Sequence, residues 1–202
     1  MKLLPESLQV LVAELGKLPG VGERTAMRYA VSLLRAGPRR LNDMQRALRA
    51  AGEDVSHCST CHFWTQAGFC PICADHQRPI ARLCVVRDSP DVVALERFRA
   101  HAWKYHVLQG LLSPLGGVGP QQLRLDSLFR RIQDNGIQEI ILALDATVEG
   151  DATSLYIRDH LRESNPGLKL TRTAMGLPAG SSVEYLDPST LENALTHRTD
   201  FD

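Results

Sequence analysis

Four cysteines in two close pairs constrain this chain more than any other feature of its sequence. Cys58 and Cys61 are separated by two residues, as are Cys70 and Cys73, and eight residues separate the two pairs. Each pair can present two thiolates from one tight turn, and two such turns form a tetrahedron that suits Zn²⁺, with Zn–S distances of about 2.3 Å. Because four thiolates leave no open coordination position, the spacing predicts a structural zinc site with one ion per chain.

Other interpretations of the same cysteines are an iron–sulfur cluster, a redox-active dithiol pair, or free cysteines that happen to fall in pairs. Three histidines that flank the cluster, His57, His62 and His76, could replace a thiolate, although such residues more often lie at the surface or behind the ligands. The fifth cysteine, Cys84, lies in an apolar run, which favours burial in a strand over reactivity.

The composition is that of an ordinary globular protein. The 202 residues, 44% of them hydrophobic and 23% charged, allow one large domain or two to three small modules with a buried core. No apolar run approaches the roughly 18 residues of a membrane span, and the first residues lack the apolar core of a signal peptide. We therefore expect a cytoplasmic protein with no membrane contact.

Charge is unevenly distributed along a chain whose 23 basic and 23 acidic residues cancel. Nine basic and four acidic residues give residues 1–52 a net charge of +5, whereas five basic and twelve acidic residues give residues 134–202 a net charge of −7. A basic first segment and an acidic last one are compatible with a polyanion bound at one end of the chain.

The first fifty residues predict a helix–hairpin–helix. Apolar spacing indicates helices over residues 7–15, with Ser7 as N-cap, and over residues 23–34, with a third at 42–51. Between the first two lies a tight turn, Leu18-Pro-Gly-Val-Gly22, in which the apolar Val21 can fill the seam between the helices. The second helix is expected to stop at Gly37-Pro38.

This hairpin is a candidate nucleic-acid site. The unpaired N–H groups of the turn and of the following helix's first turn can bind a phosphate without contacting a base. The candidate contacts are Lys17, Gly20, Gly22, Arg24 and Arg28. The alternative is a helical corner in which the glycines serve packing alone and the arginines form an ordinary solvated face.

After the cysteines, short β-rich runs alternate with helical stretches, which predicts βα units around a largely parallel sheet. The expected strands are 83–86, 106–112, 140–144 and 168–171, with helices opening at Ser89 and over 126–133 and 151–161.

Carboxylates follow two of these strands, where the chemistry of parallel sheets usually collects. Asp88 follows the first strand, and Asp145, Glu149 and Asp151 follow the third. Such a group can hold Mg²⁺ for phosphoryl transfer. Alternatively, Glu149 and Asp151 simply favour the N-terminus of the next helix through its dipole.

Taken in order, these motifs resemble the RecR family of bacterial recombination mediators. The resemblance is carried by residues 18–28, 58–73, 105–120, 147–153, 171–180 and 184–187. It implies an α/β multi-module fold: a helix–hairpin–helix DNA-binding module at 1–53, a four-cysteine zinc finger at 54–77, a Toprim-like βα domain with a parallel central sheet at 78–176, and a C-terminal subunit-contact segment at 177–202.

The resemblance also implies a function. Proteins of this family act with RecO and RecF to help load RecA on single-stranded DNA at gaps and breaks, without catalysis. The implied molecule is a homodimer or homotetramer ring, associated with the nucleoid, that binds single- and double-stranded DNA without sequence preference. In this resemblance Gly20 and Gly22 contact phosphates, Arg24 and Arg28 supply basic DNA contacts, the four paired cysteines bind zinc, and Glu149 and Asp151 serve partner binding.

One residue departs from the family pattern. Arg87 stands where family members usually carry an acidic residue, the glutamate of catalytic Toprim enzymes. A cation there repels Mg²⁺ and is expected to pair with the remaining carboxylates, and its pKa is too high for acid–base catalysis. The competing hypotheses are a Mg²⁺-dependent Toprim nuclease or primase-like enzyme that uses Glu149 and Asp151, and a protein-only interaction module that uses the acidic tail.

Overall fold

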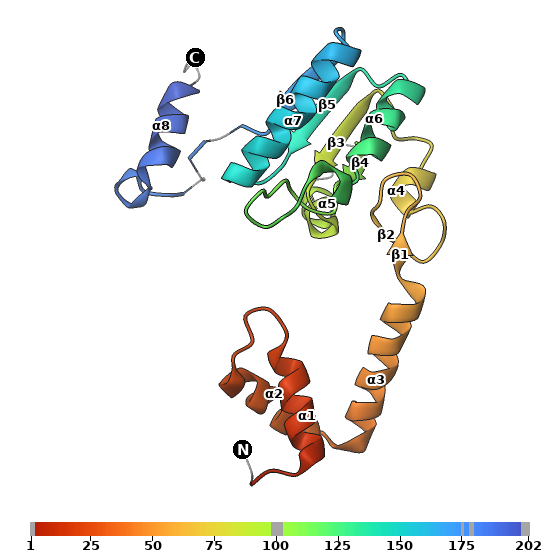
Figure 1. Ribbon diagram of the computed structural model, residues 1–202, viewed down its shortest axis with the longest axis vertical. Coiled ribbons are helices and arrows are strands. Elements are labelled where there is room, and N and C mark those ends of the chain that lie inside the picture. Colours follow the sequence, from red (N-terminus) through yellow and green to blue (C-terminus); the bar gives the residue numbers. More distant parts are fainter. Residues whose placement is uncertain (1–2, 98–102, 175, 178–179, 199–202) are drawn as a thin grey trace. The chain divides into compact units, whose positions relative to one another are not determined.

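The computed structural model describes residues 3–97, 103–174, 176–177 and 180–198. Two compact units make up the chain, a helical unit at Met1–Val55 and a βα unit at Ser56–Asp202 (Figure 1). Residues 178–179 and 199–202 of the predicted C-terminal segment lie outside the described residues. No helix in the described ranges is long and apolar enough to span a membrane.

The helical unit contains three helices, α1 (Glu6–Gly16), α2 (Glu23–Arg35) and α3 (Gly37–Asp54). Its small core is formed by Val12, Ala26 and Ala30, with partly buried apolar side chains around them. Val21 is one of these, so the turn does place an apolar residue against the seam, as predicted.

Two expectations for the helical unit were wrong. Helix α1 has Pro5 rather than Ser7 at its N-cap, and no side chain caps it. The third helix, α3, begins at Gly37 rather than at residue 42, because a proline in the first helical turn needs no N–H partner and has a suitable φ. Helix α2 does end just before Gly37-Pro38, as predicted. The reversal of direction falls on Gly37, with φ +84°.

The βα unit is built on a four-stranded parallel sheet in the order β4-β3-β5-β6. Its elements are β1 (Ser56–His57), β2 (Trp64–Thr65), α4 (Pro71–Ala74), β3 (Arg82–Val86), α5 (Ser89–Leu95), β4 (Lys104–Val107), a 3-10 turn (Pro120–Gln122), α6 (Leu125–Asp134), β5 (Glu139–Ala143), α7 (Val148–Ser164), β6 (Lys169–Arg172), a 3-10 turn (Val183–Tyr185) and α8 (Pro188–Thr196).

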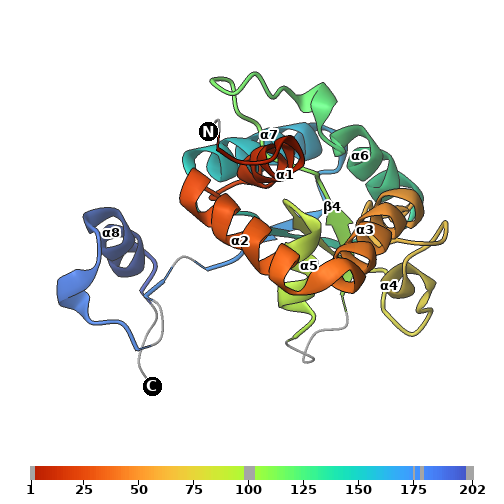
Figure 2. The ribbon, with the colours of Figure 1, turned by 90° about the horizontal axis from the view of Figure 1, so that it is seen from below.

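Helices cover both faces of the sheet, with α6 and α7 on one side and α5 on the other (Figure 1 and Figure 2). Alternate residues of β3 divide accordingly: Leu83 and Val85 belong to the core beneath α6 and α7, and Cys84 and Val86 to the core beneath α5. Cys84 is therefore a buried strand residue, as predicted, and burial raises the pKa of its thiol to about 12.

Three strands lie within one or two residues of their predicted limits, and β4 differs more. It spans Lys104–Val107 rather than 106–112, because Gln109 and Gly110 adopt positive φ angles of 63° and 138° that end the extended conformation. The segment 108–112 instead leaves the sheet and packs over the core beneath α6 and α7.

The cysteine-rich segment covers the edge strand β4. The Val107 N–H donates to the Cys61 carbonyl at 2.8 Å, and Gln109 Nε2 donates to the His62 carbonyl at 2.7 Å. Backbone groups on a sheet edge need partners or cover. The finger supplies both here, so it forms one compact unit with the sheet.

Candidate functional sites

The four paired cysteines lie together, with the thiol sulfurs of Cys58, Cys61, Cys70 and Cys73 within 4.8 Å of one another. The first three are fully buried and the fourth is partly buried. A tetrahedral Zn²⁺ with four bonds of about 2.3 Å separates its sulfurs by about 3.8 Å, so the donor set fits this ion. None of the three flanking histidines belongs to the cluster, and His62 Nε2 is hydrogen-bonded to Ser127 Oγ at 2.8 Å.

The thiols are electrostatically coupled. Hydrogen bonds with Cys70 and Cys73, together with burial, raise the pKa of the Cys61 thiol. The hydrogen bond from Cys61 lowers the pKa of the Cys70 thiol. Several thiolates in so small a space are stable only when a cation offsets their charge, and a coordinated metal supplies that charge.

The hairpin of the helical unit has the opposite character, since it is open to solvent. Gly20 has φ +76°, which a side chain would strain, whereas Gly22 has an ordinary φ of −77° and nothing within 4 Å of a Cβ placed on it. Gly22 is the N-cap of α2 and offers no side chain to the first-turn amides. Packing among the residues that the structure describes therefore does not require glycine at position 22.

The basic side chains at this turn are exposed, and they differ in their partners. Lys17 Nζ pairs with Glu14 at 2.6 Å, an ion pair open to solvent. By contrast, Arg24 and Arg28 form no ion pair with any residue that the structure describes, and the Arg28 guanidinium lies 5.6 Å from the centre of the Tyr29 ring. Two guanidinium groups thus stand unneutralised beside open helix amides.

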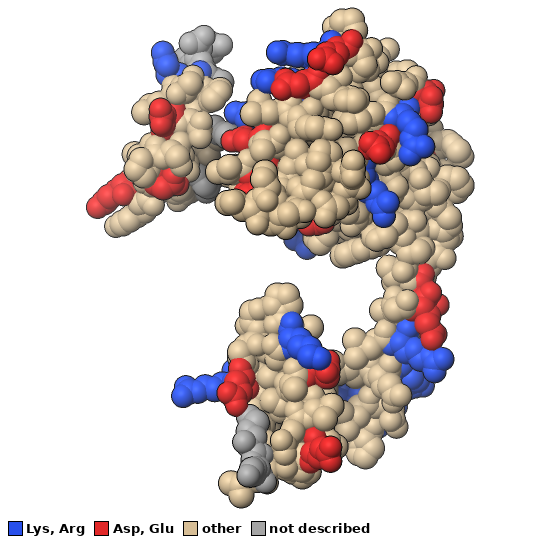
Figure 3. All heavy atoms as spheres, in the orientation of Figure 1, with Lys and Arg blue, Asp and Glu red and all other residues tan. Residues whose placement is uncertain are grey.

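Further basic side chains gather along α3, with acidic ones at its C-terminal end (Figure 3). Two of them are paired within the helix, Arg46 with Asp43 at 2.5 Å and Arg49 with Glu53 at 2.8 Å. These exposed arginines are partly neutralised, unlike those at the hairpin.

The candidate acidic site lies where the strand order reverses, at the carboxyl ends of β3 and β5. Arg87 occupies the centre of it: Nε donates to Asp88 at 2.7 Å and Nη1 donates to Asp145. The predicted pairing with the remaining carboxylates is therefore confirmed. The hydrogen bond to Asp88 and the neighbouring carboxylates raise the pKa of Arg87, so its charge is permanent at this point.

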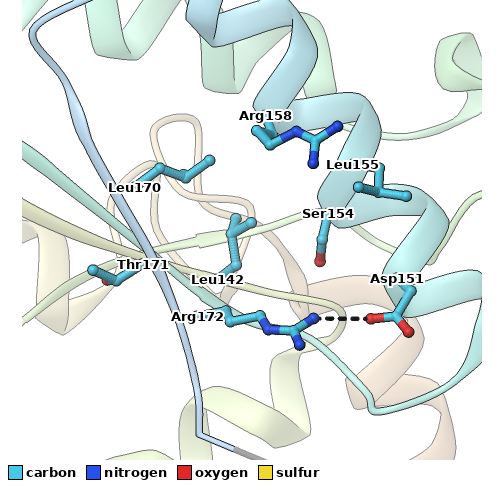
Figure 4. A pocket seen from close by; sticks show the side chains of 8 residues that line it. All are labelled: Leu142, Asp151, Ser154, Leu155, Arg158, Leu170, Thr171 and Arg172. Atoms are coloured by element: carbon cyan, nitrogen blue, oxygen red, sulfur yellow. Dashed lines mark hydrogen bonds and ion pairs between the residues drawn. The ribbon is translucent and has the colours of Figure 1, made fainter. Parts of the chain in front are cut away.

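Glu149 and Asp151 lie in the first turn of α7, and both are exposed. Asp151 accepts from Arg172 Nη1 of β6 at 3.3 Å, across a cavity of about 460 Å³ (Figure 4). The carboxylates after β5 thus have different partners: Asp145 forms an ion pair with Arg87, and Asp151 forms one with Arg172. Among the residues that the structure describes, the cysteines form the only group of three or more potential metal ligands.

Sequence reasoning missed two residues that hold this loop. A Cβ on Gly150 would lie 1.9 Å from the Asp145 carbonyl oxygen, so only glycine lets α7 begin against the loop. The buried Thr153 hydroxyl donates to the Glu149 carbonyl at 2.7 Å and accepts from the Leu112 N–H at 2.9 Å. Both residues lie in the segment 147–153 that carries the family resemblance, and the glycine in a first helical turn was a further signal.

Comparison with known protein families covers almost the whole chain. Family models match at residues 8–52 (RecR, helix-hairpin-helix), 55–75 (RecR, four-cysteine zinc finger domain), 81–174 (Toprim domain) and 176–199 (RecR, C-terminal). This combination defines a zinc-finger protein of DNA recombination and repair that carries a Toprim domain.

Similar proteins identify the family. A recombination protein RecR of Myxococcus xanthus is 45% identical over 198 residues, covering 98% of this chain and all of the relative. RecR proteins of Synechococcus sp. WH7803 and Moorella thermoacetica are 45% and 41% identical over 93% and 96% of the chain, and over 93% and 96% of their own lengths. The chain belongs to the RecR family of recombination proteins, which confirms the resemblance, the fold class and the role in DNA repair.

Proposed function

We propose that this protein is a non-catalytic DNA clamp and adaptor that acts with RecO and RecF to help load RecA on single-stranded DNA at gaps and breaks. The proposed modules are 1–53, 54–77, 78–176 and 177–202. Cys58, Cys61, Cys70 and Cys73 hold one structural zinc per chain, which closes the finger and takes no part in DNA chemistry.

The observation that carries the proposal is the open hairpin. Gly22 has no packing role within the chain, the first turn of α2 has no side-chain cap, and Arg24 and Arg28 lack ion-pair partners among the described residues. Such a turn suits a phosphate that approaches the backbone closely, with Gly20 supplying the turn and Lys17 adding charge nearby. Because no base edge is read, binding is independent of sequence and falls with salt.

The pairing of Arg87 supports the absence of catalysis. Its guanidinium already neutralises Asp88 and Asp145, where a Toprim enzyme would need a divalent ion. The competing hypothesis, a Mg²⁺-dependent nuclease or primase-like enzyme, predicts DNA cleavage or nucleotide incorporation that Glu149→Ala abolishes. We expect neither activity in the presence of Mg²⁺.

Exposed Glu149 and Asp151 are proposed as contacts for partner proteins rather than for a metal. We further propose a homodimer or homotetramer ring at the nucleoid, which encloses single- or double-stranded DNA. Light scattering with and without DNA tests the ring directly, since a monomer in both conditions cannot enclose a strand.

The DNA contact is tested by fluorescence anisotropy with labelled duplexes of two unrelated sequences. We expect equal affinity for both, and a loss of about tenfold or more in the double variant Arg24→Ala/Arg28→Ala. The matched control is Arg46→Ala/Arg49→Ala, which removes the same charge from the exposed face of α3. Equal losses of affinity in the two double variants would mean that the hairpin arginines contribute only through the overall charge. Unaltered DNA binding in Arg24→Ala/Arg28→Ala would reject the proposed hairpin contact.

A further inference from the structure

Two cations of the βα domain are buried beside the finger. Lys104, the first residue of β4, and Arg131, in α6, are each only 8% exposed. Within the described part of the chain neither forms an ion pair with a carboxylate. Because an unpaired buried charge is costly, both residues need a source of negative charge nearby.

Lys104 reaches into the end of the finger. Its Nζ donates to the carbonyl oxygens of Ile72 at 2.8 Å, Cys73 at 3.1 Å and Asp75 at 2.7 Å. All three donors of the ammonium group are used, and all three acceptors lie in or just after α4, the helix that carries Cys73. The ammonium group therefore contacts the backbone of the second cysteine pair.

Arg131 approaches the same cysteines from α6. Its Nη1 donates to the Tyr105 carbonyl at 2.6 Å, next to Lys104 in the edge strand. Arg131, Lys104 and Cys73 also line one cavity of about 440 Å³. Burial lowers the pKa of Arg131, whereas the negative charge of all four cysteines of the finger raises it. The guanidinium group therefore interacts electrostatically with the whole cluster.

The charge of the two buried cations matches the charge of a zinc-loaded cysteine cluster. A Zn²⁺ ion with four thiolates has a net charge of −2, and three of the four ligands are buried in this finger. Lys104 and Arg131 together contribute +2. The two buried cations therefore offset the charge that the metal and its four ligands carry together.

We propose that Lys104 and Arg131 are the counter-charges of the zinc-loaded finger, so that zinc retention depends on the βα domain. This inference goes beyond the proposed function, since it requires neither DNA nor partner proteins. It also couples the finger to the sheet, because cations from β4 and α6 lie buried beside the charged metal site.

Zinc release to a chromogenic chelator tests the proposal on the full-length protein. Lys104→Met and Arg131→Met remove each charge while keeping a long side chain, and we expect zinc to leave about tenfold faster from each. Lys169→Met and Arg130→Met are the matched controls, since both side chains are exposed on the same sheet and helix, and their release rates should equal the wild-type rate. Release within twofold of wild type in both test variants would overturn the proposal.

Thermal unfolding separates counter-charge from hydrogen bonding. Each methionine variant should lose more stability in the zinc-loaded protein than in zinc-stripped protein, because the two cations offset the net charge of −2 that the zinc-loaded site carries. An equal loss in both states would assign the two residues a purely structural role and overturn the proposal.

Charge-preserving variants decide the question even if a methionine variant does not fold. Lys104→Arg and Arg131→Lys alter the hydrogen bonds but keep the charges, and we expect zinc release within about threefold of the wild-type rate. Release from these variants more than tenfold faster than from wild type would show that charge is not what retains the metal.

Discussion

The finger and the hairpin are both built from tight turns, yet one is closed and the other open. The finger buries three of its four thiols, and its backbone is hydrogen-bonded to β4. The hairpin leaves Gly22 exposed, with space around it, and leaves Arg24 and Arg28 without ion pairs among the described residues. The first arrangement suits an ion that stays with the protein, and the second suits a partner that comes and goes.

This difference shows how to distinguish a structural site from a binding surface. Residues of the closed site have internal partners, so changing them should affect folding first. Residues of the open site have few internal partners, so changing them should affect ligand affinity while stability stays constant.

Loss of one thiol should affect the molecule most. Cys61→Ser is expected to abolish stoichiometric zinc and lower the melting temperature by about 10 °C or more, because metal-binding energy at a four-thiolate site is also folding energy. Elemental analysis and thermal unfolding measure the two effects. Cys84→Ser is the control, since it alters a buried thiol outside the cluster and should keep the zinc. A zinc-free Cys61→Ser protein with wild-type stability would contradict a structural site.

Two glycines should behave in opposite ways. Gly150→Ala is expected to cost about 3 kcal/mol, because its Cβ would collide with the Asp145 carbonyl oxygen and α7 would have to shift. Urea unfolding measures the loss. Gly167→Ala, with nothing within 4 Å of its Cβ, is the control and should be nearly neutral. A neutral Gly150→Ala would show that the loop after β5 adapts easily.

Acid should destabilise the junction between finger and sheet through His106. This buried ring donates from Nε2 to the Arg124 carbonyl at 2.9 Å, its Nδ1 has no partner in the described structure, and burial lowers its pKa to about 3. The histidine of the unfolded chain binds a proton below about pH 6.5, whereas the buried ring of the folded chain binds one only near pH 3. The contribution of His106 to the free energy of unfolding is therefore complete above pH 6.5 and is lost as the pH falls toward 3.

The expected loss through His106 between pH 7 and pH 5 is about 2 kcal/mol. Urea unfolding at both pH values should show a smaller drop in His106→Gln than in the wild type. Equal drops in the two proteins would mean that this ring does not control the acid response.

The smallest effect on stability is expected at the hairpin. Gly22→Ala should change the free energy of unfolding by less than about 0.5 kcal/mol, since its φ is ordinary and its Cβ meets nothing. DNA affinity should nevertheless fall severalfold, because the added methyl group holds a phosphate away from the amides. Gly52→Ala in α3 is the control and should leave affinity unchanged. Unchanged DNA affinity in Gly22→Ala would mean that no phosphate approaches the backbone closely at this residue.

The parts that could be predicted from the sequence are those with a strong local pattern. Cysteine spacing predicted the cluster, and short β-rich runs predicted β3, β5 and β6 to within one or two residues. The end of β4 was misjudged, because Gln109 and its positive φ have no signature in an apolar run.

Interactions between distant residues were harder to predict. The pairing of Arg87 with carboxylates was foreseen because Arg87 stands where the family pattern has an acidic residue beside other carboxylates. In the sequence, Lys104 and Arg131 look like ordinary surface residues. They are buried because the finger packs against β4, and the strand pattern alone does not predict that packing. Separate motifs can be recognised in this way, whereas the contacts that Lys104 and Arg131 make with the finger could not.

The central claim is that the amides of the open hairpin, backed by two guanidinium groups, hold the DNA backbone. The most direct test is the slope of log affinity against log salt for duplex DNA, in the wild type and in Arg24→Ala/Arg28→Ala. Two lost phosphate contacts should make the slope shallower by about 1.8. Identical slopes in the two proteins would contradict the claim, because the arginines would then release no counterions from DNA.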